Sequence, residues 1–139
     1  GRVYFAFGNT AYICSGSVIR DASRAGFSTV LTAAHCVYDQ KKGKFATKWM
    51  FIPDFDVSPT YTCASTYLGC WNAVAIVTRK EFTSARRLTV TALQHDWAFV
   101  VVAGGGKTGT SLQLDVTVSL NTTATGLNLA AAEQQSTTS

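Results

Sequence analysis

Residues 27–36 read FSTVLTAAHC, and the order of residue types in this stretch predicts a strand that runs directly into a short turn. The segment from Phe27 to Thr32 is rich in β-branched and aromatic residues, which favour a strand. Ala33 and Ala34 have high helix propensity and favour one helical turn. The stretch therefore predicts a strand that ends by presenting His35, with Cys36 beside it.

A second informative stretch, residues 96–102, reads DWAFVVV. The run from Trp97 to Val102 is continuously apolar, which is typical of a strand buried on both faces. Asp96 lies at the entrance of this strand, where the apolar run would shield its charge from water and strengthen its attraction for a cation. The two stretches together predict a histidine and a carboxylate, each held at the end of a buried strand.

The rest of residues 1–103 reads as further short strands separated by turns. A hairpin around Gly8-Asn9 joins strands at 3–7 and 11–19, and other strands are expected at 48–52, 71–78 and, less regularly, 88–93. About six short strands with regular turns predict an all-β fold, a six-stranded antiparallel barrel over residues 1–103. We interpret residues 104–139 as a linker and the start of an incomplete second barrel, or as a disordered tail.

The composition and the charge of the chain indicate which classes of partner it can bind. Hydrophobic residues make up 47% and charged residues 14% of the 139, which is typical of a globular chain. The positive charge gathers in two clusters, Lys41, Lys42, Lys44 and Lys48, then Arg79, Lys80, Arg86 and Arg87. We interpret both as solvated surface, with an anionic partner or a membrane surface as the alternative. Neither cluster shows the interleaved aromatics of a nucleic-acid face, and no apolar run approaches the roughly 18 residues of a membrane helix. We therefore expect neither a nucleic-acid nor a membrane partner.

The four cysteines form an even set, which predicts disulfides and an oxidising compartment, so we expect a secreted, extracellular protein. Three connectivities are possible, and Cys14 with Cys36 and Cys63 with Cys70 is the most natural pairing. No C-x-x-C spacing is present, and the spacing of Asp39, Asp54 and Asp56 fits no cation loop. We expect no metal and no cofactor.

Two longer segments give the chain a family resemblance. Cys14-Ser15-Gly16-Ser17-Val18-Ile19, and then Val30 to Val37 with the Thr-Ala-Ala-His-Cys motif, resemble the first half of secreted trypsin-like serine proteases, and Asp96-Trp97-Ala98-Phe99-Val100 resembles their aspartate motif in the same order. Residues 1–5 and 48–53 are closer to the microbial, glutamyl-endopeptidase-like branch. The resemblance covers roughly residues 1–103.

That resemblance implies a fold of two six-stranded Greek-key barrels with the active site between them. His35 would be the general base and Asp96 the carboxylate that orients it, both on the first barrel. The second barrel would provide the serine nucleophile, the oxyanion hole and the specificity pocket. A disulfide from Cys36 back to Cys14 would fix the turn that carries the imidazole.

This sequence departs from the family pattern in several places. It contains no Gly-Asp-Ser-Gly-Gly motif, the gap between His35 and Asp96 is somewhat long, and the Cys63 to Cys70 region looks like an insertion. Ser111 meets the pattern of a nucleophile elbow only in part, and Ser15 and Ser17 lie in an expected core strand, so none of them is expected to act as the nucleophile.

We therefore expect the N-terminal part of a secreted serine endopeptidase that cleaves proteins or peptides, inactive alone and completed by a second barrel on a C-terminal part or on a separate chain. The alternative is a non-catalytic, protease-like binding domain that uses its exposed inter-barrel face.

Overall fold

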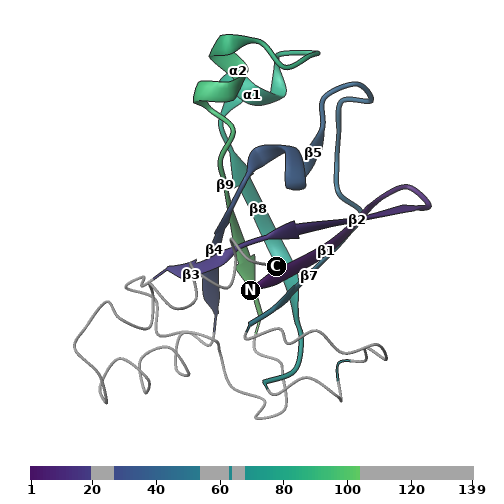
Figure 1. Cartoon of the computed structure of the whole chain (residues 1–139), viewed down its shortest axis with the longest axis vertical. Helices are drawn as coiled ribbons and strands as arrows, with labels where there is room; N and C mark the ends of the chain where they lie inside the picture. The colour runs from purple at the N-terminus through teal and green to yellow at the C-terminus, as the bar shows by residue number, and fades with distance from the viewer. Residues whose placement is uncertain (20–26, 54–62, 64–67, 104–139) are drawn as a thin grey trace.

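A computed structural model describes residues 1–19, 27–53, 63 and 68–103 of the chain (Figure 1). The interpretation of residues 104–139, and that of Ser111 within them, lies outside the described residues. The strands are β1 (Arg2–Phe7), β2 (Thr10–Ser15), β3 (Ser17–Ile19), β4 (Ser28–Thr32), β5 (Tyr38–Asp39), β6 (Lys44–Phe45), β7 (Lys48–Ile52), β8 (Trp71–Thr78) and β9 (Ala98–Val102). The helical segments are η1 (Ala34–Cys36), α1 (Lys80–Thr83) and α2 (Val90–Gln94). None of the described helices is long and apolar enough to cross a membrane.

Seven of these strands form one sheet that closes into a barrel. Its order is β2-β1-β7-β8-β9-β4-β3, and every neighbouring pair is antiparallel. The two end strands, β2 and β3, are separated in the chain by Gly16 alone. They are therefore one strand bent at Gly16, whose first half pairs with β1 and whose second half pairs with β4. Counted this way, the sheet is a closed ring of six strands, and the predicted all-β, six-stranded antiparallel barrel is confirmed.

The connections of the ring follow a Greek-key order. Strand β4 does not pair with β7, the next barrel strand in the chain, but with β9, the last one described. The chain between β4 and β7 contains η1 and a small separate hairpin, β5 with β6. Beyond β8, helices α1 and α2 stand together at one end of β8 and β9 (Figure 1). The end of β4 and the beginning of β9 therefore meet at the end of the barrel that carries the helices.

The core lies inside the ring and is built from alternating positions of the strands. Inward residues that are essentially fully buried come from six strands: Val3 of β1, Val18 of β3, Val30 of β4, Phe51 of β7, Trp71 of β8, and Val100 and Val102 of β9. In β4 and β9 a buried residue alternates regularly with a half-buried one. Burial of these side chains removes apolar surface from water, which is the main force that holds the ring together.

Two details of the sequence prediction were wrong. Strand β9, expected to be buried on both faces, is fully buried on its inner face only; the outward Phe99 is half-buried and packs edge-on against Trp97, with ring centroids 5.4 Å apart. The expected strand at 88–93 is instead the helix α2, since Thr89 caps its start by accepting the Ala92 backbone N–H at 3.1 Å. In such a short segment the apolar residues alone could not separate a strand from a helix.

The bend at Gly16 generates a stability prediction. A Cβ at this position would lie 2.7 Å from Val30 Cγ1 and 3.2 Å from Val3 Cγ2, inside the packed barrel. Gly16→Ala should therefore lower the free energy of unfolding by about 1–3 kcal/mol, measured by chemical denaturation. Gly8→Asn is the control, because Gly8 has φ +62 and open space around it, a conformation that asparagine tolerates. The control should change stability by about 0.5 kcal/mol or less; equal losses in both variants would contradict the packing argument.

Candidate active site

His35 occupies the middle of η1, the single 3-10 turn that follows β4. Ala33 is still extended, with φ −76 and ψ 147, and the chain turns over the next three residues. Ala34 and Cys36 are buried on either side, whereas the His35 side chain is 56% exposed. The tight turn therefore fixes its two flanking residues in the core and directs the imidazole outward.

Three contacts fix this turn and the end of β4 to neighbouring strands. The Cys14–Cys36 disulfide joins the turn to β2 with a Cα–Cα distance of 6.2 Å. The buried Trp49 indole donates from Nε1 to the Cys36 carbonyl oxygen at 3.1 Å. The Thr32 hydroxyl donates to the Ser15 carbonyl oxygen at 2.7 Å. A catalytic base must be held closely in place, and these contacts restrict the backbone on both sides of His35.

Asp96 lies between the end of α2 and the beginning of β9. Its side chain is only 14% exposed, so the carboxylate is largely shielded from water. It accepts two hydrogen bonds from one residue: Oδ1 accepts the His35 backbone N–H at 2.9 Å, and Oδ2 lies 2.6 Å from His35 Nδ1. The two contacts fix both the backbone and the ring of the histidine relative to the carboxylate.

This geometry assigns the tautomer of His35. An ionised carboxylate can only accept hydrogen bonds, so Nδ1 carries the proton that points toward Asp96. In the neutral ring the lone pair is then on Nε2, which has no hydrogen-bond partner within the part of the chain that the structure describes. Nε2 is therefore free to take a proton from a donor, and Asp96 is placed to stabilise the resulting imidazolium.

The second histidine has a separate environment. His95 Nδ1 lies 2.9 Å from the Thr91 carbonyl oxygen on the same helical segment, and the residue is half-buried. Although His95 precedes Asp96 in the sequence, its ring nitrogen is engaged with its own helix. The structure thus brings His35 and Asp96 together and leaves His95 outside the pair.

The four cysteines form two disulfides, Cys14–Cys36 and Cys63–Cys70, the latter with a Cα–Cα distance of 5.4 Å. The sulfur atoms of Cys14 and Cys36 and a ring nitrogen of His35 lie within 4.8 Å of one another. Because both sulfurs are in a disulfide, they cannot serve as thiolate ligands, so this cluster does not form a metal site. Two disulfides are typical of proteins from an oxidising compartment.

Trp49 is the contributor to this site that sequence reasoning missed. Its side chain is buried, and its indole N–H donates to the carbonyl oxygen of Cys36, next to His35. The only signal in the sequence is that a buried tryptophan needs an acceptor for its indole N–H. This signal does not identify the acceptor.

Comparisons with known proteins support the fold and leave the family open. No family model and no curated protein matches the chain. Among solved structures, protease Anisep from Arthrobacter nicotinovorans matches with a TM-score of 0.55 and 30% sequence identity. The match covers 73% of this chain and 40% of that protease. The chain is therefore similar to part of a protease structure and spans well under half of its length.

The contact with Asp96 predicts which ring nitrogen of neutral His35 carries the proton, and NMR can observe this tautomer. In ¹⁵N-detected NMR of the neutral imidazoles, His35 should carry its proton on Nδ1. In Asp96→Asn, the new side-chain amide can donate to the ring, so the proton should move to Nε2. His95 serves as an internal control in the same spectra, because the Thr91 carbonyl keeps its Nδ1 protonated in both proteins. An unchanged His35 tautomer in Asp96→Asn would show that Asp96 does not orient the ring.

Proposed function

We propose that the described barrel is the proton-handling half of a secreted serine endopeptidase. The observation that supports this most strongly is the contact between His35 and Asp96, in which a shielded carboxylate orients a histidine that keeps Nε2 open. The similarity to part of protease Anisep supports the proposal further, because it shows that a fold of this kind occurs in a protease. Substrates would be proteins or peptides.

The proposed reaction proceeds through an acyl-enzyme. A serine Oγ attacks the carbonyl carbon of the scissile peptide bond while His35 Nε2 takes the hydroxyl proton. The imidazolium, stabilised by Asp96, then donates that proton to the leaving amine as the C–N bond breaks. A water molecule then attacks the acyl-enzyme ester in the same way, with His35 again as the base, which releases the carboxylic acid and regenerates the serine. In this scheme His35 exchanges one proton in each half-reaction, and Asp96 remains ionised.

The nucleophile of this reaction would come from outside the described residues. Among them, no serine hydroxyl is hydrogen-bonded to His35, and Ser17, which we considered from the sequence, is only 8% exposed within β3. We therefore propose that a second barrel, on the same polypeptide or on another, provides the serine and the oxyanion hole. The 139-residue chain by itself is then expected to have no specific peptidase activity.

A non-catalytic binding domain is the second candidate, and one exposed apolar surface could serve either function. Leu88, Val90 and Leu93 around α2 are 59%, 74% and 57% exposed, close in sequence to Asp96. An exposed apolar group of this kind is typical of a surface that another protein or domain covers. A second barrel would cover it in the enzyme, whereas a partner protein would cover it in a binding domain.

The test uses the complete product of the gene that encodes this sequence, with a fluorescent fluorophosphonate and casein as substrates. We expect covalent labelling and casein cleavage, because the probe reacts with an activated serine. His35→Ala should abolish both, and Asp96→Asn should reduce kcat by about 10⁴-fold, the established magnitude for Ser-His-Asp proteases.

His95→Ala is the matched control, a neighbouring histidine outside the pair, and its activity should stay within about twofold of the parent. A gene product that is folded but neither labelled nor proteolytic would refute the enzyme and favour the binding domain. Activity that survives His35→Ala would refute the assigned role of His35.

A further inference from the structure

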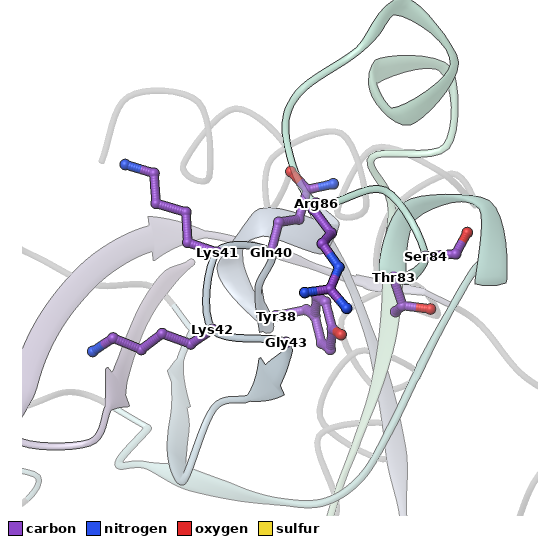
Figure 2. A pocket seen from close by; sticks show the side chains of 8 residues that line it. All are labelled: Tyr38, Gln40, Lys41, Lys42, Gly43, Thr83, Ser84 and Arg86. Atoms are coloured by element: carbon purple, nitrogen blue, oxygen red, sulfur yellow. The ribbon is translucent and has the colours of Figure 1, made fainter.

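Members of both basic clusters of the sequence, which the site above does not use, line the same pocket. Lys41 and Lys42 of the first cluster and Arg86 of the second line one pocket, between the β5–β6 turn and the segment that follows α1 (Figure 2). Neither His35 nor Asp96 lines it. Residues more than forty positions apart in the sequence therefore line one pocket, with the Arg86 guanidinium near Tyr38 and the two lysine side chains extending outward from the turn.

The pocket has walls that are tied to each other. On one side, Gln40 donates from Nε2 to the Phe82 carbonyl oxygen of α1 at 3.0 Å. At the base, the Tyr38 ring packs edge-on against Phe82, with centroids 6.5 Å apart, and against Phe45 at 4.9 Å. Phe82 itself is fully buried in the core. The two walls are thus connected by a hydrogen bond and by aromatic packing without any ligand.

The turn that carries the lysines is also internally fixed. Asp39 Oδ1 accepts the backbone N–H groups of Lys41 and Lys42 at 3.0 and 3.1 Å, and the Gly43 N–H donates to the Asp39 carbonyl oxygen at 2.7 Å. Gly43 has φ +64, a conformation that closes the turn and that glycine adopts at little cost. The Asp39 carboxylate is therefore engaged with the turn backbone.

The three cations have no carboxylate partner among the residues that the structure describes. Within those ranges the acidic residues are Asp39, Glu81 and Asp96. Glu81 pairs with Arg79 at 2.7 Å, and Asp96 pairs with His35. Glu81 accepts hydrogen bonds from its backbone and from Arg79, which lower the pKa of its carboxyl, so it remains ionised and committed to that pair. Among the described residues Lys41, Lys42 and Arg86 thus form no ion pair, and the one carboxylate near them, that of Asp39, is hydrogen-bonded to the turn backbone.

The pocket is lined by donors of the kinds that bind a tetrahedral oxoanion. Figure 2 shows the Arg86 guanidinium extending toward Tyr38, whereas Lys41 and Lys42 extend outward from the turn. A guanidinium donates two parallel hydrogen bonds to a phosphate or sulfate group, and a tyrosine hydroxyl can add a third. The long lysine side chains can rotate toward a bound anion and contribute charge.

We propose that this pocket binds a phosphate or sulfate group, independently of whether the proposed function is correct. Its volume is about 370 Å³, which lies within the range of small-molecule sites and is more than a single oxoanion fills. The group can come from a free ion or from a monoester on a small organic body such as a sugar, and the volume favours the monoester.

The test is a ¹H–¹⁵N NMR titration of the 139-residue chain at low ionic strength with inorganic phosphate, inorganic sulfate, glucose 6-phosphate and unmodified glucose. We expect saturable shifts at the amides of Lys41, Lys42, Gly43 and Arg86 with every oxoanion and none with glucose. Tighter binding of glucose 6-phosphate than of phosphate supports the monoester as the ligand, and equal binding supports the free group. Arg86→Gln should raise Kd about tenfold, because it removes a charged, bidentate donor.

Arg87→Gln is the matched control, since it removes the same charge from the adjacent exposed residue, which does not line the pocket. Its Kd should change by no more than about twofold. Equal losses in the two variants would show a diffuse charge effect and would overturn the proposal. The absence of saturable shifts up to about 50 mM oxoanion would overturn it as well.

Discussion

The pairing of β4 with β9 is the constraint on which the site depends. The register places Thr32, the last residue of β4, opposite Ala98, the first residue of β9. Because the strands are antiparallel, the chain leaves β4 and enters β9 at the same end of the barrel. η1 with His35 follows one of these points, and Asp96 precedes the other by two residues. His35 and Asp96, which are 61 positions apart in the sequence, are thereby brought together, with His35 Nδ1 2.6 Å from Asp96 Oδ2.

The barrel core maintains this register. Val30 and Val100 are paired across the two strands, and both are fully buried, so a slip of one residue would move them to the outer face. The bend at Gly16 then lets one strand pair with β1 and with β4 in turn, which closes the ring beside the site. Cys14 lies on that same bent strand, and its disulfide to Cys36 ties the ring closure to the turn that carries the histidine.

The sequence predicted the strands that run into His35 and out of Asp96, because both have strong β-propensity and sharp boundaries. It did not predict the helix α2 within 88–94, where the Thr89 hydroxyl accepts the Ala92 backbone N–H, because apolar residues in so short a segment fit a strand as well as a helix. The bond from Trp49 to the Cys36 carbonyl and the meeting of Lys42 with Arg86 were also beyond it. Both depend on which surfaces the closed barrel brings together, a tertiary property that local patterns do not contain.

The central claim is that His35 and Asp96 are the proton-handling half of a site completed by a serine from outside the described barrel. The most direct measurement is a crystal structure of the complete gene product after reaction with a fluorophosphonate. We predict a phosphonylated serine whose Oγ lies about 3 Å from His35 Nε2, with the Asp96 contact intact. A structure in which the modified residue lies elsewhere, and the His35 ring remains open to solvent, would contradict the account.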